Sequence, residues 1–235
     1  MQSVDNVRKE LAGKEIYIIR HAQGEHNVSS KFSFDPPLTT EGLKQVKSQH
    51  KLATTLGVEC VIVSPLRRTL QTADGLFPGH GNMIAFEHVR EVMGETCNIR
   101  LPVAEAEKNF PGVDWRLMKG VGLEGPDREI ARFVADDRDG DDLTKMECRD
   151  PESFPAMMQR SEEVIALLAA RPETKIAVVS HCVFLAAFIA VLRGGFADEN
   201  GDEMGDYLEN CEIRIIQDVS PTSTFRRTKA KKDQN

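Results

Sequence analysis

Two histidines, a glutamate and several arginines stand directly after short apolar runs of this 235-residue chain. In chain order they are Arg20-His21, Arg67-Arg68, Arg90-Glu91 and His181. An arginine guanidinium offers a planar fork of donors that suits phosphate oxygens, and a neutral imidazole can attack phosphorus as a nucleophile. The combination predicts a site that binds a phosphoryl group and passes it through a histidine.

The carboxylate completes this chemistry. Cationic neighbours favour the neutral, nucleophilic form of an imidazole. The leaving alkoxide then needs a proton, which Glu91 can supply before it takes one from the water that hydrolyses a phosphohistidine. Because phosphoryl transfer is accelerated mainly by positioning and by charge around the equatorial oxygens, the arginines should matter as much as the nucleophile.

The elements that must position these residues alternate along the chain. Apolar runs rich in β-branched residues predict strands at residues 15–19, 60–63, 83–89, 175–179 and 211–216. Helical periodicity predicts helices after an N-cap at Thr39, over residues 70–76 and over residues 154–168, and residues 183–192 are apolar on every helical face. We therefore expect an α/β fold with a mostly parallel central sheet flanked by helices on both faces. In such sheets ligands bind beyond the carboxyl ends of the strands.

Composition limits the classes of protein. Hydrophobic residues make up 40% and charged residues 29%, which is typical of a globular chain. Acidic residues outnumber basic ones by 37 to 30, which argues against a nucleic-acid partner. The N-terminus lacks an apolar segment, and the longest apolar run falls far short of the ~20 residues that span a membrane. Five scattered cysteines without a C-x-x-C pair fit a reducing compartment, so we expect a cytoplasmic protein with no membrane association.

Residues 1–235 are expected to form a single domain with two irregular parts. Residues 97–151, rich in Gly, Pro and charge, are interpreted as an inserted lid over one end of the sheet, with a helix near residues 127–134. Residues 221–235 are basic and poor in hydrophobic residues, which is typical of a flexible tail.

Four motifs in order resemble the histidine phosphatase superfamily, the phosphoglycerate mutase-like enzymes. Ile19-Arg20-His21-Ala22 is similar to its opening Arg-His-Gly signature, and Leu38-Thr39-Thr40-Glu41-Gly42 to its Leu-Thr-x-x-Gly. The segment from Ser64 to Ala73 is similar to its second-arginine segment, and Ser180-His181 matches its late Ser-His. The resemblance covers about residues 15–192. The stretch from Arg90 to Trp115 further resembles a little-characterised branch of plants, fungi and protists.

The resemblance implies roles for individual residues. His21 would be the nucleophile, and Arg20, Arg68 and His181 would hold the phosphoryl group. His21, Glu91 and His181 would be the catalytic residues. Asn27 would add a hydrogen bond to phosphate, and Glu91 would be the proton donor. Arg100 is a candidate contact to the substrate outside the transferred phosphate, with an ordinary salt bridge as the alternative.

Several residues are given other interpretations. Ala22 and Cys182 replace glycines of the family pattern, and Cys182 is interpreted as a packing residue although a thiol at a helix start can be activated. Arg67 is interpreted as a surface residue. The remaining histidines are interpreted as structural, namely His26, His50, His80 and His88.

The sequence favours a metal-independent phosphomonoester hydrolase that acts through phosphohistidine on a small phosphorylated metabolite and needs no cofactor. A phosphoglycerate-mutase-type phosphotransferase is the alternative, and residues 97–151 show no basic cluster for the second phosphate that it would hold. A zinc hydrolase using His21, His181 and Glu91, or a silent phospholigand sensor, would fit less well. The sequence carries no signal for the physiological substrate or the oligomeric state.

Overall fold

A seven-stranded sheet forms the centre of the computed structural model, which describes residues 9, 11–29, 33–118, 133–134, 147–148, 151–193, 207–216 and 226–227. The strand order is β4-β3-β2-β7-β1-β8-β9. The strands are β1 (Glu15–Arg20), β2 (Cys60–Val63), β3 (Met83–Ala85), β4 (Val113–Asp114), β7 (Lys175–Ser180), β8 (Ile213–Ile216) and β9 (Arg226–Arg227). Strands β4, β3, β2, β7 and β1 pair in parallel, whereas β8 and β9 are antiparallel. The predicted mostly parallel sheet is confirmed.

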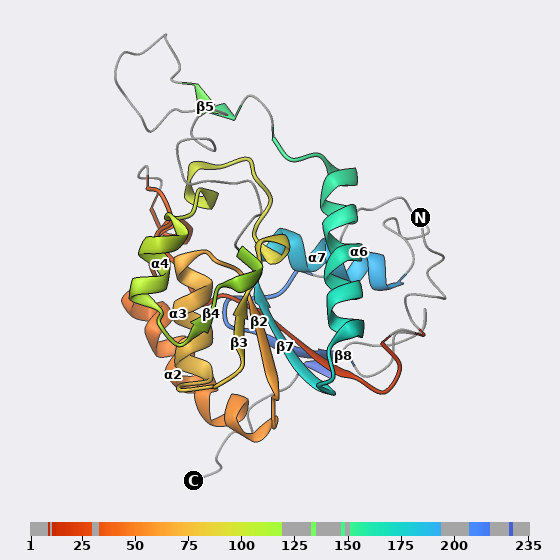
Figure 1. Cartoon of the computed structure of the whole chain (residues 1–235). Helices are drawn as coiled ribbons and strands as arrows, with labels where there is room; N and C mark the ends of the chain where they lie inside the picture. The colour runs from red at the N-terminus through yellow and green to blue at the C-terminus, as the bar shows by residue number, and fades with distance from the viewer. Residues whose placement is uncertain are drawn as a thin grey trace.

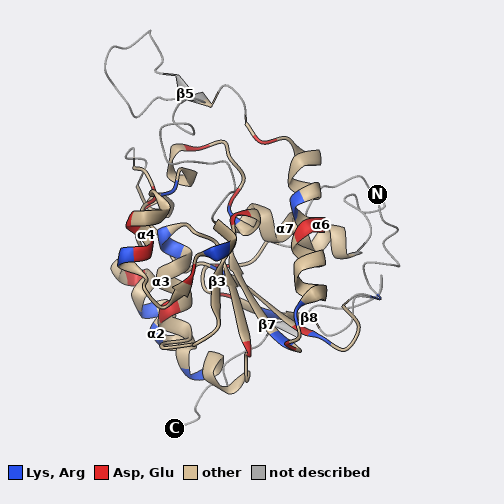
Figure 2. Ribbon diagram, in the orientation of Figure 1, with Lys and Arg blue, Asp and Glu red and all other residues tan. Residues whose placement is uncertain are grey.

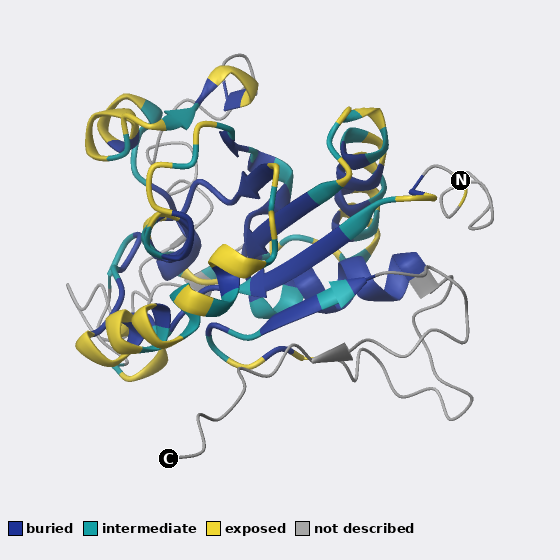
Figure 3. Ribbon diagram, turned by 90° about the horizontal axis from the view of Figure 1, so that it is seen from below, coloured by how far each residue is buried: buried dark blue, intermediate teal, exposed yellow. Residues whose placement is uncertain are grey.

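Helices cover both faces of this sheet, as predicted (Figure 1). On one side lie α2 (Thr40–Thr55), α3 (Arg67–Leu76) and α4 (Val103–Asn109), and on the other lie α6 (Phe154–Ala170) and α7 (Cys182–Arg193). Short 3₁₀ turns link them: η1 (Glu25–Asn27), η2 (Glu87–Val89), η3 (Thr96–Asn98) and η4 (Arg116–Met118). Seen from below, the strands are buried while the outer helix faces are exposed (Figure 3). The pattern is that of a doubly covered α/β sheet.

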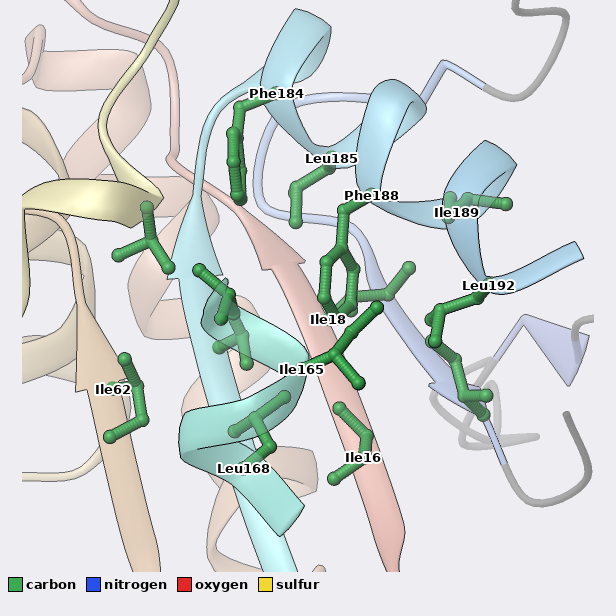
Figure 4. Close-up of a cluster of buried hydrophobic side chains, with 14 of the residues drawn as sticks. Ile16, Ile18, Ile62, Ile165, Leu168, Phe184, Leu185, Phe188, Ile189 and Leu192 are labelled. Atoms are coloured by element: carbon green, nitrogen blue, oxygen red, sulfur yellow. The ribbon is translucent and has the colours of Figure 1, made fainter. Parts of the chain in front are cut away.

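Helix α7 has the all-round apolar sequence that predicts a fully packed helix. Its side chains from Phe184 to Leu192 are at most 8% exposed. They pack with strand residues and with α6 in one cluster, in which Figure 4 labels Ile16, Ile18, Ile62, Ile165, Leu168, Phe184, Leu185, Phe188, Ile189 and Leu192. Each fully buried side chain of this kind contributes about 1.5–3 kcal/mol, so the helix that follows His181 is firmly held.

Two strands are shorter than predicted. The run at residues 83–89 divides into β3 and the turn η2, because the chain leaves the sheet after Phe86 donates its last ladder bond to the Val63 carbonyl. The run at residues 211–216 becomes β8 only from Ile213, because Cys211 has a positive φ of 59° that an extended strand excludes. The turn at η2 brings Arg90 and Glu91 back over the sheet end.

The expected lid is only partly described. Its first part, residues 97–118, packs against the body of the fold. β4 extends the central sheet beside β3, and Ala106 of α4 packs in a hydrophobic cluster that also contains Val61 and Val63 of β2. The insertion of residues 97–151 as a lid stays a prediction. Of the helix expected near residues 127–134, only Phe133 and Val134 are described, and they pair with β6 (Glu147–Cys148) as strand β5. The rest of the lid lies outside the described residues, as does all of the predicted tail except Arg226 and Arg227.

Charged residues lie mainly on the helices and at the strand ends, whereas the middle of the sheet is free of them (Figure 2). None of the helices in the described ranges has the length and apolar character that crossing a membrane requires.

Candidate active site

The candidate site lies beyond the carboxyl ends of three neighbouring parallel strands, β2, β7 and β1. Arg20 ends β1 and pairs in register with Ser180, the last residue of β7. His21 and His181 are therefore the next residues of adjacent strands, and their ring centroids are 5.1 Å apart. Ser64 follows β2 directly, so the sheet brings residues from three distant segments to one edge.

His21 is buried, with 2% of its surface exposed, and its hydrogen bonding defines its tautomer. Its Nδ1 lies 2.7 Å from the carbonyl oxygen of Ala22. A carbonyl oxygen only accepts, so Nδ1 carries the proton and Nε2 keeps a lone pair. Burial and then the charge of Arg68 hold the pKa of His21 well below its ordinary value. His21 is thus a neutral imidazole with a free lone pair on Nε2, the form that a nucleophile requires.

The second histidine, His181, is completely buried beside it. Its Nε2 lies 2.8 Å from the hydroxyl oxygen of Ser64, while no protein group among the described residues bonds its Nδ1. Burial and the charge of Arg68 also lower the pKa of His181 well below its ordinary value. Both histidines facing this site are therefore neutral.

Two arginines bring positive charge to the same place. Arg68, only 1% exposed, is held by hydrogen bonds from Nη1 to the Cys97 carbonyl (2.9 Å) and from Nη2 to Asn98 Oδ1 (2.7 Å). Arg20 donates from Nη1 to the Leu208 carbonyl at 2.8 Å. In both residues the Nε–H is buried and unpartnered within the described part of the chain. Because buried donors are almost always hydrogen-bonded, unpartnered guanidinium donors beside His21 define a place for an acceptor such as an anion.

Glu91 lies at the start of α7 rather than free in solvent. Its carboxylate oxygens accept from the backbone N–H groups of Val92 (3.0 Å), Phe184 (3.0 Å) and Val183 (3.3 Å). A carboxylate in this place also complements the partial positive charge of the helix N-terminus. Its negative charge acts on Arg68, which shows that it belongs to the same electrostatic neighbourhood.

The Leu-Thr-x-x-Gly motif fixes the loop that follows His21. Thr39 caps α2 by accepting from Gly42 N, and its backbone N–H and hydroxyl both donate to Gln23. Gly42 is needed for this contact, because a Cβ built there would lie 2.1 Å from the Gln23 carbonyl oxygen. Helix α2 therefore acts as the support for residues 22–27.

His26, interpreted from the sequence as structural, lies beside the predicted nucleophile. Its ring centroid is 5.3 Å from that of His21, and burial together with Arg68 and Arg20 lowers its pKa to about 3. Gly24 leaves room for it, since a Cβ there would lie 2.8 Å from two ring atoms. The available signal was a histidine in the short loop directly after Arg20-His21, and lone histidines in loops are too common for that to suffice.

Asn27, predicted to bind phosphate, is exposed and has other partners. Its Oδ1 accepts from Gly24 N at 2.9 Å, and its Nδ2 lies 3.2 Å from His26 Nε2. These bonds shape the loop and orient His26, and the contact between Asn27 and phosphate stays a prediction.

Arg100 forms an internal ion pair. Its Nε donates to Glu87 Oε2 at 3.0 Å and its Nη1 to the Leu101 carbonyl, and only 4% of its surface is exposed. Of its two predicted interpretations, the structure favours the salt bridge over the substrate contact.

Other sequence interpretations concern residues around the site. Arg67 is exposed, as predicted. Burial raises the pKa of the Cys182 thiol, although Arg20 opposes the shift, so the protonated, unreactive form is favoured and a packing role fits. Asp35, which the sequence did not single out, accepts from Arg67 N and Leu101 N and so ties the start of α3 to the loop that holds Arg68. A positive φ of 43° at Asp35 has no sequence signal that distinguishes it from an ordinary turn aspartate.

Comparison with known protein families identifies the superfamily of this chain. The model of the histidine phosphatase superfamily (branch 1) matches residues 16–118 and 120–220. The match covers most of the chain, which therefore belongs to this superfamily.

Curated relatives share most of their length with it. A phosphoglycerate mutase-like protein of Arabidopsis thaliana is 31% identical, over 86% of this chain and 83% of the relative. A probable phosphatase of Schizosaccharomyces pombe is 29% identical, over 74% of this chain and 77% of the relative.

Among solved structures, a putative alpha-ribazole-5'-P phosphatase from Escherichia coli is similar with a TM-score of 0.57, 20% identity and coverage of 86% and 89% of the two chains. A mycobacterial glucosyl-3-phosphoglycerate phosphatase is similar with a TM-score of 0.52 and 19% identity, and the match covers 86% of this chain and 92% of that one. At these identities the likeness concerns the fold.

Proposed function

We propose that this protein is a phosphomonoesterase that hydrolyses a small phosphorylated metabolite through a phosphohistidine at His21. The observation that carries the proposal is the neutral His21 with its free Nε2 lone pair, set among the unpartnered buried nitrogens of Arg20, Arg68 and His181. An ester phosphate supplies both an electrophilic phosphorus and acceptor oxygens for those donors.

In the first step, Nε2 of His21 attacks phosphorus in line, a P–N bond forms and the P–O bond to the leaving group breaks. The guanidinium groups of Arg20 and Arg68 carry the charge on the equatorial oxygens. Arg68 is already anchored by Cys97 and Asn98, so it needs little reorganisation to do so. Because burial lowers the pKa of His21, its lone pair stays available at pH values well below the ordinary histidine pKa.

In the second step, water attacks the phosphohistidine, the P–N bond breaks and inorganic phosphate leaves. Glu91 enters the first step as the carboxylic acid, donates its proton to the leaving alkoxide and becomes the carboxylate, and in the second step it takes a proton from the attacking water and returns to the acid. Three backbone N–H groups hold the Glu91 carboxylate at the start of α7, which keeps it close to the cationic cluster. The protein residues thus balance the protons over the full cycle.

The chemistry of the side chains supports a mechanism that uses no metal ion. Arg68 acts on both His21 and His181 with a positive charge, and this charge would repel a dication held between the two rings.

The decisive measurement is phosphate release from a panel of phosphomonoesters in excess chelator, together with trapping of phosphoprotein by a quench in alkaline detergent. We expect turnover to survive the chelator and an acid-labile, alkali-stable phosphoryl label to form on the native protein. His21→Ala should abolish both, while His88→Ala, which removes a partly buried histidine paired with Glu163, should leave both unchanged. Turnover that the chelator abolishes would contradict the proposal.

Transfer of the label to a second phosphorylated acceptor instead of to water would favour the mutase-type alternative.

A further pair of variants tests the phosphate contact. Arg68→Lys keeps the charge but cannot reproduce the guanidinium bonds, so kcat/KM should fall about 100-fold or more. The adjacent, exposed Arg67→Lys is the matched control and should retain native kinetics.

A further inference from the structure

The contact between Ser64 and His181 joins two neighbouring strands at the centre of the candidate site. Ser64 follows β2 and His181 follows β7, and the two strands pair in parallel with Val63 opposite Val179. Both side chains are completely buried, and Ser64 Oγ lies 2.8 Å from His181 Nε2. The serine backbone is fixed as well, because its N–H donates to the Val179 carbonyl and its carbonyl accepts from the Thr69 hydroxyl.

Two hydrogen-bond arrangements are compatible with this distance. In the first, the Ser64 hydroxyl donates to His181 Nε2, and the imidazole proton is on Nδ1. In the second, Nε2–H donates to Ser64 Oγ, and Nδ1 carries a lone pair. The Leu66 N–H approaches Ser64 Oγ at 3.4 Å in either arrangement, so the oxygen already has one donor.

Counting buried groups distinguishes the two. No acceptor other than His181 lies within bonding distance of the Ser64 hydroxyl among the described residues, and Nδ1 of His181 has no protein partner there. The first arrangement leaves one group unpartnered, the Nδ1–H. The second leaves two, the serine proton and the Nδ1 lone pair. Unpartnered buried polar groups cost free energy, so the first arrangement is favoured.

We propose that Ser64 is a positioning residue that holds neutral His181 in the Nδ1–H tautomer, so that Nδ1 donates a hydrogen bond to an oxygen of the transferred phosphoryl group. A phosphoryl oxygen accepts from Nδ1–H but cannot bond to a lone pair, so only this tautomer makes His181 useful there. The donor role rests on the proposed function, whereas the tautomer is a property of the free protein. Neutral His181 gains this donor without a net charge because burial and Arg68 disfavour its imidazolium form.

The tautomer is tested by two-bond ¹H–¹⁵N NMR of protein labelled with ¹⁵N in its histidine rings, at pH 7.5, with His181 assigned from His181→Asn. In the native protein we expect Nδ1 to show the signature of a protonated ring nitrogen and Nε2 that of a lone-pair nitrogen. In Ser64→Ala we expect this preference to be lost or reversed. A native His181 protonated on Nε2, or a tautomer that Ser64→Ala leaves unchanged, would overturn the proposal.

Ser161→Ala is the matched control. Ser161 is also completely buried, but its hydroxyl donates to the Met157 carbonyl within α6, so its removal costs a buried hydrogen bond without touching a histidine. This variant should keep the His181 tautomer and the native kcat. Ser64→Ala, which removes the hydroxyl without adding volume, should lower kcat about 10-fold or more for the best ester of the panel.

Titration with inorganic phosphate tests the donor role separately from turnover. The Nδ1–H resonance of native His181 should move downfield with phosphate, and Ser64→Ala should lack this response. A correct tautomer with no phosphate response would overturn the donor role. Failure of the proposed function would show differently, as a native protein that binds phosphate through His181 but forms no phosphohistidine.

Discussion

At the residue scale, the site depends on which nitrogen of each histidine is protonated. His21 donates from Nδ1 to the Ala22 carbonyl, and this bond leaves Nε2 free for attack. The backbone carbonyl that follows the nucleophile in sequence therefore selects the reactive tautomer. Replacement of the family's usual glycine by Ala22 leaves this carbonyl in place, and the alanine N–H is bonded to Thr72 Oγ1 at 3.0 Å.

His26 is the residue-scale prediction. The ring lies beside His21 and its pKa is lowered to about 3, so we expect it to contact bound phosphate as a neutral group, and His26→Ala to remove that contact without changing the charge of the site. We expect KM to rise about 3- to 10-fold, the size of one neutral hydrogen bond, while the phosphohistidine still forms. Steady-state kinetics with the trapping assay measures both effects.

Asn27→Ala should shift KM in the same direction by a smaller factor, because it removes only the group that orients His26. His80→Ala, which removes a histidine bonded to the Val58 carbonyl, serves as the control. Unchanged kinetics in His26→Ala would contradict a contact between this ring and the substrate.

At the scale of elements, Asp35 connects helix α3 to the loop that carries η3. One carboxylate oxygen accepts from Arg67 N at 2.7 Å, the first residue of α3, and the other accepts from Leu101 N at 3.1 Å. The same loop supplies Cys97 and Asn98 to Arg68. The position of the Arg68 guanidinium thus depends on a carboxylate from a third segment.

Asp35→Asn is the element-scale prediction, because an amide keeps one acceptor oxygen and tolerates the positive φ at this position. Loss of one of the two bonds should lower the free energy of unfolding by about 1 kcal/mol and raise KM several-fold. Denaturant unfolding and kinetics measure these effects. Asp74→Asn, an exposed carboxylate on α3, is the matched control. Native KM in Asp35→Asn would show that the loop holds Arg68 without this link.

A second connection supports Glu91. Arg160 of α6 donates from Nη1 to the carbonyls of His88 (2.7 Å) and Arg90 (3.1 Å) and forms an ion pair with Glu152. Its guanidinium also lies 5.0 Å from the ring centroid of Phe184 in α7. The segment that ends in Glu91 is therefore held by Arg160 of α6 and by backbone N–H groups of α7.

At the scale of the whole molecule, burial of neutral histidines makes stability depend on pH. His21 and His181 have pKa values well below 6.5 and His26 a pKa of about 3, so the unfolded chain binds protons below pH 6.5 that the folded protein does not. Asp35 acts in the opposite sense, because burial raises its pKa from 3.8 to about 6 and the folded protein binds its proton first. Between pH 6.5 and 5 the three histidines therefore make the unfolded chain bind more protons than the folded protein, despite the opposite effect of Asp35.

We expect the free energy of unfolding to decrease as the pH falls from 6.5 to 5, with a slope of about 1.4 kcal/mol per pH unit for each net proton taken up. Urea unfolding across this range gives the slope, and His26→Asn should reduce it by about one proton. Stability that stays constant or rises on acidification would contradict the neutral state of these histidines.

Local sequence patterns predicted the five strands that carry the site and the core, the apolar faces of the main helices and the residues at the strand ends. β-Branched runs and helical periodicity are local signals, and they place Arg20, His21 and His181 correctly at the carboxyl ends of β1 and β7. The prediction of helices on both faces follows from the alternation of these elements. The same local rules predicted too long a strand at residues 86–89, where the chain leaves the sheet after Phe86 and the His88 carbonyl accepts from Arg160 of α6 instead of from a neighbouring strand.

How these residues act on one another depends on hydrogen bonds and burial that exist only in the folded chain. Which nitrogen of His181 is protonated depends on Ser64, which is 117 residues away in the chain. The salt bridge of Arg100, the link made by Asp35 and the place of His26 beside His21 likewise depend on distances between segments. Residue type and spacing identify which chemistry is available, but hydrogen-bond partners and burial assign it, because both are set by which distant segments meet in the folded chain.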